Sequence, residues 1–334
     1  MKIAIHHKPG SFSDRWIEYC QKNNIEYKLV DAYASDIIEQ MKECDAFMWH
    51  HSHADYRDVL FAKQLIYSLE TMGVKCFPDF HTTWHFDDKV GQKYLLEAVG
   101  APLVPSYVFY TKKEALAWIE RTSFPKVFKL RGGAGAANVM LAHTKQEARK
   151  LVKKAFGKGF PQFDRAGYLK ERYRKWREGK NSFFGVLKGI GRLFITTNFA
   201  KMHPREKGYA YFQEFIPNNN YDTRIVVIGG KKAMGERRYC RKGDFRASGS
   251  GDFEYVKIEP EILKIAFNMA EKLKLQSVAF DFIYEDAQPL IVEISYGFGT
   301  HGIRNSGGYY TRDFQWHATD NFDFCGWMIE NLMQ

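Results

Sequence analysis

The sequence contains no long apolar run and few cysteines. No stretch of about 18 apolar residues occurs in its 334 residues, which excludes a hydrophobic helix that spans a membrane. The five cysteines are scattered, without a Cys-x-x-Cys pair, so we expect neither a disulfide framework nor a zinc site. Residues 1–8 have the pattern of a short strand and lack the apolar core of a signal peptide. We therefore expect a soluble, cytoplasmic protein, with peripheral contact at the inner membrane face as a further option.

The composition is that of a globular protein with more than one packed unit. Hydrophobic residues make up 45% of the chain, and its length is sufficient for two or three units. Short apolar runs alternate with helical patterns near the N-terminus; the runs lie at 2–5, 27–30, 46–49 and 74–77. This alternation predicts a parallel, doubly wound sheet in an N-terminal α/β domain.

Residues 278–295 read as two strands joined by a polar turn. Pro289 cannot donate a hydrogen bond to a neighbouring strand, so we assign it to the loop. Pairing Tyr284 with Leu290 then places Asp281 directly opposite Glu293. Facing carboxylates repel each other unless a cation lies between them, and hard oxygen ligands suit Mg²⁺ that carries nucleotide phosphates. A solvated hairpin with two exposed acids is the alternative interpretation.

Residues 124–141 read as a strand, a glycine-rich turn and a second strand. Gly132, Gly133 and Gly135 would let backbone N–H groups approach phosphate oxygens, and Lys129 would supply a positive charge. No Gly-Lys-Ser/Thr follows, so this is not a Walker A loop, and a strand rather than a helix comes next, so it is not a dinucleotide fingerprint. An ordinary hairpin tip is the alternative.

A third segment, 209–217, is an apolar strand that ends at a proline and is followed by three asparagines. Its backbone N–H and C=O groups could face the edge of an adenine ring. Taken in order, these segments resemble the ATP-grasp superfamily, particularly the RimK-like and D-alanine–D-alanine-ligase-like carboxylate–amine ligases. The resemblance covers roughly residues 85 to 300. It includes residues 88–105, which look like a helix with a phosphate-binding lysine followed by Gly-x-Pro-x-x-Pro.

The resemblance implies a set of site residues. Nucleotide-binding positions would be Lys89, Lys129, Gly132, Gly133, Gly135, Gln213, Glu214, Phe215 and Ile216. Catalytic arginines would be Arg224, Arg237 and Arg246. Arg304 is a further catalytic candidate from outside the family pattern, because it lies in a glycine-rich cationic loop that reads either as an acceptor or intermediate loop or as a plain connection. Metal ligands would be Asp281, Glu293 and Ser295. Family members usually have asparagine at the position of Ser295, and a hydroxyl is a weaker ligand than a carboxamide, so one of two expected ions would be held loosely.

The fold and activity implied by the resemblance are specific. We expect a mixed α/β and α+β chain with an ATP-grasp fold behind an N-terminal doubly wound parallel-sheet domain (a pre-ATP-grasp domain). The expected units are 1–100, 101–208 with the glycine loop, and 209–334 with the hinge, arginines and metal site. The expected enzyme uses ATP with Mg²⁺ or Mn²⁺ to join a carboxylate and an amine through an acyl phosphate, releasing ADP and phosphate. Its substrates would be small molecules or glycans, as in decoration of a cell-surface polysaccharide. A phosphotransferase acting on a hydroxyl and a non-catalytic nucleotide-binding module remain the alternatives.

Two further segments lie outside the family pattern. Residues 160–208 contain twelve Lys/Arg and four Asp/Glu, about +8 of the formal net charge of +10. With their aromatic and apolar neighbours, residues 165–192 favour an anionic membrane surface or a lipid-linked acceptor, against a solvated face as the bland alternative. Nucleic acid is not the expected partner, because no recognisable binding module is present. His50, His51 and His53 follow a predicted strand; polar loop, substrate contact and metal binding are the readings left open.

Overall fold

The structure, a computed structural model, describes the chain except residues 134–137, 178, 180–181, 196, 242 and 320–321. The first unit is a parallel sheet with strand order β2-β1-β3-β4. Its strands are β1 (Ile3–His6), β2 (Tyr27–Val30), β3 (Ala46–Trp49) and β4 (Lys75–Phe77), connected by α1 (Phe12–Lys22), α2 (Ile37–Met41) and α3 (Tyr56–Thr71). The side chains of Ser11 and Asp55 accept hydrogen bonds from the first turns of α1 and α3, which fixes where these helices begin. The predicted doubly wound parallel sheet is confirmed.

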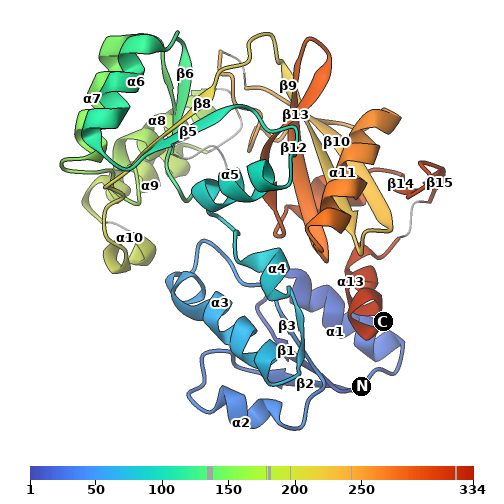
Figure 1. The fold of residues 1–334 in the computed structure, drawn as a ribbon. Coiled ribbons are helices and arrows are strands. Elements are labelled where there is room, and N and C mark those ends of the chain that lie inside the picture. Colours follow the sequence, from blue (N-terminus) through green and yellow to red (C-terminus); the bar gives the residue numbers. More distant parts are fainter. Residues whose placement is uncertain (134–137, 178, 180–181, 196, 242, 320–321) are drawn as a thin grey trace.

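The second unit is an antiparallel sheet with order β5-β8-β6-β7 (Figure 1). Its strands are β5 (Ser106–Phe109), β6 (Lys126–Lys129), β7 (Val139–Ala142) and β8 (Ala210–Glu214). Its core includes residues from α6 (Lys112–Arg121) and α7 (Lys145–Ala155). Between β7 and β8 the chain forms α8 (Arg165–Arg177), α9 (Phe183–Phe194) and α10 (Asn198–Met202). The strand β8, which falls in the predicted unit 209–334, therefore pairs with the second sheet; the predicted unit boundaries themselves stay a prediction.

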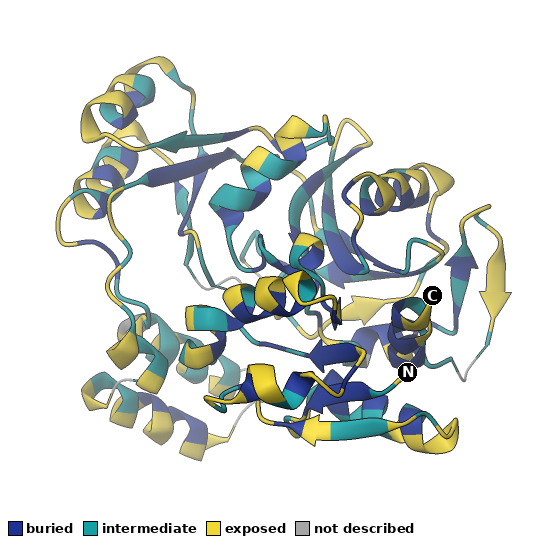
Figure 2. Ribbon diagram, turned by 60° about the horizontal axis from the view of Figure 1, so that its bottom comes forward, coloured by how far each residue is buried: buried dark blue, intermediate teal, exposed yellow. Residues whose placement is uncertain are grey.

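The third unit is a larger, seven-stranded sheet, mainly with order β13-β12-β9-β10-β14-β15, and β11 pairs with β10. Its strands are β9 (Tyr221–Ile228), β10 (Lys232–Tyr239), β11 (Phe253–Glu254), β12 (Ser277–Glu285), β13 (Gln288–Ser295), β14 (Gly308–Thr311) and β15 (Trp316–Ala318). The helix α11 (Pro260–Lys272) packs against it, and α4 (Phe80–Thr83), α5 (Lys89–Ala98) and α12 (Thr300–Arg304) lie in connections. Figure 2 shows that the strands of the sheets are largely buried, while the helices expose their outer sides.

The β12–β13 hairpin differs in detail from the predicted pairing. Asp281 does lie opposite Glu293, but Tyr284 pairs with Pro289 instead of Leu290, and the register shifts after Asp281. The turn consists of Asp286 and Ala287, both with positive φ, as in the two-residue turns that join twisted strands. Pro289 thus lies in the strand, where β13 forms the edge of the sheet and a proline is tolerated. A β-bulge at Val292 absorbs the difference.

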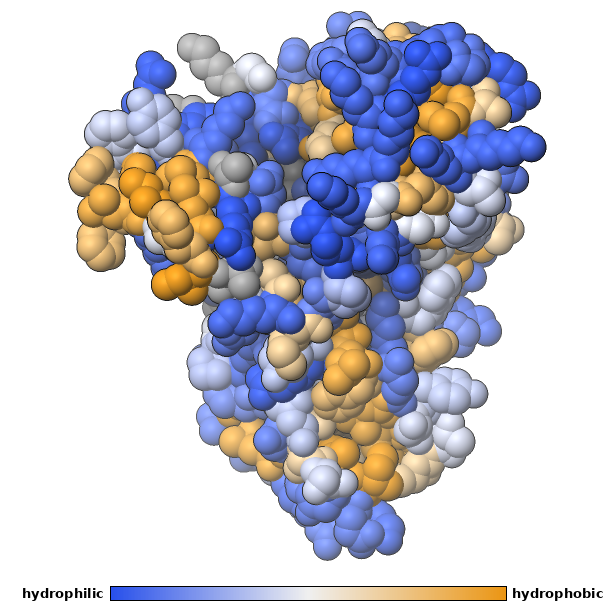
Figure 3. Space-filling view, turned by 90° about the vertical axis from the view of Figure 1, so that its left-hand side faces the viewer, coloured by the Kyte–Doolittle hydropathy of each residue, from blue (hydrophilic) through white to orange (hydrophobic). Residues whose placement is uncertain are grey.

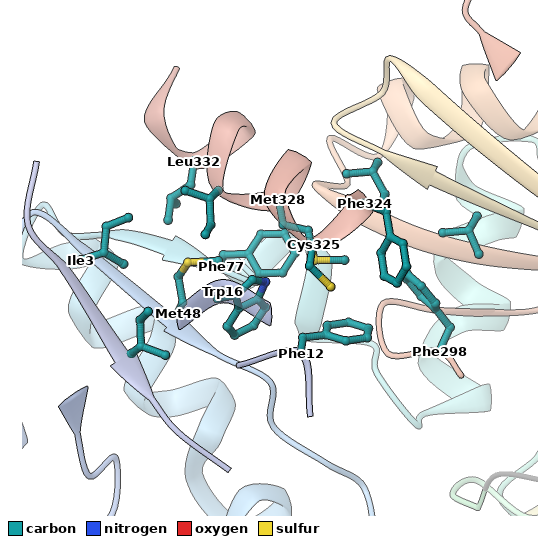
Figure 4. Packing of buried hydrophobic residues seen from close by; sticks show 14 of the residues in the cluster. Ile3, Phe12, Trp16, Met48, Phe77, Phe298, Phe324, Cys325, Met328 and Leu332 are labelled. Atoms are coloured by element: carbon teal, nitrogen blue, oxygen red, sulfur yellow. The ribbon is translucent and has the colours of Figure 1, made fainter. Parts of the chain in front are cut away.

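The last helix, α13 (Phe324–Met333), joins the first and third units. Figure 4 shows Met328 and Leu332 of this helix beside Trp16 and Phe77, and Phe324 next to Phe298. The same core includes residues of β9 and β12, so the two sheets share one apolar cluster. This contact fixes the N-terminal loops relative to the large sheet. Among the described residues, no helix combines the length and apolarity needed to cross a membrane.

Candidate functional site

A cavity of about 560 Å³ is lined by residues from all three sheets and their loops. The N-terminal unit contributes two loops, Lys8 to Ser11 and His50 to His53. Predicted site residues that line the cavity are Lys89, Lys129, Gly133, Gln213, Glu214, Phe215, Ile216, Arg224, Arg246, Asp281, Glu293 and Ser295. The structure therefore brings most of the predicted nucleotide, arginine and metal positions into one place.

Asp281 is held by two arginines from neighbouring strands. Arg224, its cross-strand neighbour on β9, donates from Nε and Nη2 to its two oxygens at 2.8 and 2.9 Å. Arg238 on β10 lies 2.8 Å from the same carboxylate and makes two 2.6 Å hydrogen bonds to Asp222. Burial alone would raise the pKa of Asp281, but the two guanidinium groups outweigh it and hold that pKa well below its usual range. Asp281 is thus ionised and fixed in position.

Two buried lysines face the other carboxylate. Lys89, at the start of α5, donates to the carbonyl of Gly133 at 2.8 Å, and its Nζ lies 3.5 Å from Glu293 Oε1. Lys129, at the end of β6, is only 4% exposed. Burial lowers the pKa of Lys129 to about 8, with Glu293 opposing the shift and Lys89 adding to it. The cavity therefore holds two ammonium groups with little solvent around them, a setting that favours an anionic ligand.

The glycine turn begins against an acidic side chain. Gly133 has φ +112°, and its N–H donates to Asp87 Oδ1 at 2.8 Å. A Cβ on Gly132 would lie 3.0 Å from Asp87 Oδ2, so a larger residue there would displace this contact. Gly135 lies outside the described residues. The described part of the turn is thus tied to the segment that precedes α5.

The predicted hinge, residues Gln213 to Ile216, begins in the last two residues of β8 and continues beyond it. Gln213 donates to Ser106 Oγ at 3.0 Å, and Glu214 forms a 2.6 Å ion pair with Lys126. Phe215 and Ile216 continue along the cavity wall. Because Glu214 is already paired with a lysine that is 2% exposed, its side chain is fixed by the fold.

The arginines are divided between the cavity and the outside. Arg246 lines the cavity, pairs with Asp244 at 2.6 Å and donates to the carbonyl of Val139 at 3.4 Å. Arg237 instead points to the other face of β10, where it pairs with Glu259 and lies over the ring of Tyr221. Arg304 is exposed at the end of α12 and is not among the residues that line the cavity.

Comparison with known proteins identifies the domain that carries this cavity. A family model described as the RimK-like ATP-grasp domain matches residues 204–310. The chain contains a RimK-like ATP-grasp domain. A probable alpha-L-glutamate ligase from Cellvibrio japonicus is 22% identical over 92% of this chain and 91% of the relative. One from Coxiella burnetii (strain Dugway 5J108-111) is 34% identical over 28% of this chain. The matched part spans about a third (32%) of that curated relative's length.

Solved structures agree on the fold. The RimK domain ATP-grasp protein from Sphaerobacter thermophilus has a TM-score of 0.58 at 14% identity, covering 100% of both chains. The D-alanine–D-alanine ligase from Bacillus anthracis complexed with ATP has a TM-score of 0.54 at 14% identity, covering 92% of this chain and 90% of that one. At these identities the likeness shows the fold alone, and it confirms the predicted ATP-grasp architecture. The curated relatives reported above are named as probable ligases.

The ATP-grasp fold implies Mg²⁺. The strands β12 and β13, with their neighbours β9 and β10, form what we call the cavity floor, and its donor chemistry fits this ion. Asp281 and Glu293 offer hard carboxylate oxygens on adjacent rigid strands. Ser295 also lines the cavity, but its hydroxyl donates to the carbonyl of Gly297 at 2.6 Å. In the described part of the chain, no group of three or more His, Cys, Asp or Glu side chains could hold a metal. A metal site here would consist of two carboxylates, and one of them, Asp281, is also paired with Arg224 and Arg238.

Two features of the cavity were not predicted outright: sequence reasoning missed the first and left the second open. Arg238, not Arg237, reaches Asp281. The two arginines are adjacent in β10, so their side chains point to opposite faces of the sheet. A signal existed, because Asp222 and Arg238 become cross-strand partners once β9 and β10 are paired. The second feature is that the histidine loop of the N-terminal unit forms part of the wall.

The histidine loop is ordered by packing. The ring of His50 stacks on Phe12 at 3.8 Å, and its Nδ1 accepts the backbone N–H of Phe12 at 3.1 Å. Burial lowers the pKa of His50 to about 4, so the ring is neutral and its proton is on Nε2. His51 is buried and hydrogen-bonded to Thr83. The segment thus places a neutral N–H donor in the wall of the cavity.

Proposed function

We propose that this protein is an ATP-dependent ligase that forms an amide between a carboxylate and an amine through an acyl phosphate. The observation that carries the proposal is the composition of the cavity. It combines two buried lysines, a facing carboxylate pair and the hinge of an ATP-grasp domain with a neutral histidine loop from a separate unit. Such a cavity has room for a nucleotide at one end and a second substrate at the other.

In this proposal the nucleotide lies along the hinge. The backbone of Glu214 to Ile216 contacts the adenine, and Lys89 and Lys129 bind phosphate oxygens as charge-assisted donors. Asp281 and Glu293 would hold Mg²⁺, which would supply positive charge to offset that of the phosphates. Arg246 lines the cavity and is assigned to the transferring group, and Arg224 keeps Asp281 in place.

The chemistry requires little covalent participation by the protein. A carboxylate oxygen of the acid attacks the γ-phosphorus, and the bond to ADP breaks. The amine then attacks the acyl carbon, phosphate leaves, and the amine nitrogen loses a proton to solvent or phosphate. The main task of the protein is to align the reactants and exclude water, because water would hydrolyse the acyl phosphate.

The acid-to-amino-acid type of ligation and a glycan acceptor, as in polysaccharide decoration, are the finer parts of the proposal. The names of the glutamate-ligase relatives support the acid-to-amino-acid type. The second substrate is assigned to the part of the cavity lined by the N-terminal loops of Lys8 and His50. The proposal includes an anionic membrane surface as the partner of residues 165–192.

The proposal is tested by incubating the protein with ATP, Mg²⁺ and pooled carboxylates, using hydroxylamine as the amine. An acyl phosphate is trapped as a hydroxamate with stoichiometric ADP. Release of AMP, or a stable phosphoester formed on a hydroxyl, would overturn the ligase. ATP binding without any ADP would favour the non-catalytic module, an alternative motivated by the arginine clamp on Asp281.

A further inference from the structure

The α8–α9 hairpin has an apolar surface that its own fold does not use. α9 packs on α8 through small residues: Gly185, Val186 and Gly189 are buried. A Cβ on Gly189 would lie 2.9 Å from Leu169 Cδ1, so the two helices approach closely along this face. Gly185, Val186 and Gly189 therefore form the side of α9 that packs on α8.

The opposite side of α9 is apolar and exposed. Its members share the spacing of one helix side; they are Phe183, Phe184, Leu187, Ile190 and Phe194. Phe184 and Phe194, near the two ends of the helix, are 76% and 80% exposed. Trp176 of α8 extends the surface, with its ring 5.7 Å from that of Phe183. Figure 3 shows a hydrophobic patch on the lobe at its left, where these helices project from the molecule.

The same two helices carry several exposed basic side chains. Lys170, Arg177 and Lys188 are exposed on the same hairpin, and Arg172, Lys175 and Arg192 are partly exposed. The one acid described in these two helices, Glu171, is already paired with Arg174. An apolar stripe bordered by Lys and Arg is typical of helices that lie in the plane of an anionic membrane.

We propose that α9 inserts its exposed apolar face into the surface of an anionic lipid bilayer, with the basic residues of α8 and α9 at the headgroups. The helix has 12 residues, which is too short to span a bilayer but suits an interfacial position. A second copy of the chain is a poorer occupant, because it would bring two positive surfaces together. This inference gives a binding mode to the membrane partner proposed above and does not depend on the ligase chemistry.

The hairpin also contacts the rim of the cavity. Glu171 of α8 lies 3.7 Å from Arg241, which follows β10 and precedes the cavity-lining residues Phe245 to Ser248. α10 reaches α3 of the N-terminal unit. A docked hairpin would therefore hold the cavity close to the membrane, where a lipid-linked acceptor could enter.

The test is sedimentation with vesicles of equal parts phosphatidylcholine and phosphatidylglycerol, compared with pure phosphatidylcholine. We expect the full chain to sediment with the anionic vesicles at low salt and to be released as salt rises. The double variant Phe184→Ser/Phe194→Ser should lose binding. The triple variant Lys170→Gln/Arg177→Gln/Lys188→Gln should bind roughly 100-fold more weakly, from the usual contribution of a basic residue near such a surface.

Matched controls change equally exposed residues elsewhere. Leu60→Ser on α3, where Leu60 is 70% exposed, and Lys112→Gln/Lys113→Gln on α6 should sediment like the unchanged chain. Thermal unfolding and ATP binding show whether each variant is folded. Hydrogen exchange of the unchanged chain gives a readout without mutation, since vesicles should slow exchange in α9.

Failure of the unchanged chain to bind anionic vesicles, or equal binding to both vesicle types, would overturn the proposal. So would an apolar-face variant that still binds, or vesicle protection confined to other elements. A dimer that dissociates in the Phe184→Ser/Phe194→Ser variant would assign the surface to a second copy. Hydroxamate formation is measured without vesicles, so a failed ligase and a failed membrane contact give separate results.

Discussion

The cavity floor and the α8–α9 hairpin are both rich in arginine, yet they use it in opposite ways. On the floor, Arg238 is 4% exposed and contacts two carboxylates, Asp222 and Asp281. On the hairpin, Arg177 is exposed among other basic residues. Formal charge alone does not distinguish them; the local balance of acids and solvent does. Buried, paired charges fix a site in one geometry, whereas exposed charges of one sign act on an external partner and are sensitive to salt.

The largest expected contrast is in stability. Arg238→Ala would leave Asp222 and Asp281 buried with less compensation, so we expect it to lower the free energy of unfolding by about 3–5 kcal/mol. Arg177→Ala should change it by less than about 0.5 kcal/mol. Urea unfolding of both variants measures the difference. Equal effects would mean that the floor arginine is not structurally important.

Glu293 should separate catalysis from stability. Glu293→Gln removes one proposed metal ligand, but Glu293 does not share the arginine clamp on Asp281. We expect hydroxamate formation to fall by two orders of magnitude or more, about 3 kcal/mol, with little change in melting temperature. Asp281→Asn is the contrasting variant and should lose both, because it removes the carboxylate that pairs with Arg224 and leaves Arg238 with Asp222 alone. A Glu293→Gln protein with normal turnover would remove Glu293 from the site.

Lys129 provides a pH test of the nucleotide end. Lys129→Ala should weaken ATP binding by about 1–3 kcal/mol, the range for a charge-assisted hydrogen bond. The pKa of Lys129 is about 8 in the free protein, and bound phosphate should raise it. ATP affinity should therefore be constant below pH 8 and fall as pH rises above it, with proton uptake on binding. Calorimetry below and above pH 8 checks this. The Lys129→Ala variant is the control, because its ATP affinity should not follow this titration.

The smallest effect is expected at Ser295. A carboxamide reaches further than a hydroxyl and is a better ligand for a hard cation, so Ser295→Asn should lower the Mg²⁺ concentration needed for half-maximal turnover by a few-fold, below about 1 kcal/mol. Ser295→Ala is the matched control and should leave that concentration equal or raise it. An unchanged requirement in Ser295→Asn would show that this position does not face the ion.

The sequence was sufficient for the ATP-grasp fold, because its ordered motifs resemble those of that family, and for the N-terminal parallel sheet, because the local period depends on neighbouring residues. The opposition of Asp281 and Glu293 was also predicted, although by a pairing that is wrong at Tyr284. A wrong turn assignment and an unforeseen bulge at Val292 cancelled each other. Bulges depend on the twist of the whole sheet, which a single strand pattern does not report.

What was missed depends on contacts distant in sequence. The choice between Arg237 and Arg238 depends on the register of β9 and β10, and His50 reaches the cavity only because the first unit is docked on the large sheet. His50 was left open among loop, substrate and metal readings, since nothing near it in sequence shows that it stacks on Phe12.

The core in Figure 4 can be completed only late in the synthesis of the chain. β1 is synthesised long before α13, yet Ile3 and Leu332 belong to one cluster. At a synthesis rate of about 5–20 residues per second, roughly 15 to 60 s pass between synthesis of the N-terminal sheet and synthesis of α13. During that interval Trp16 and Phe77 lack part of their apolar surroundings. The N-terminal sheet therefore exposes apolar surface, to which chaperones or other chains can bind, until α13 has been synthesised.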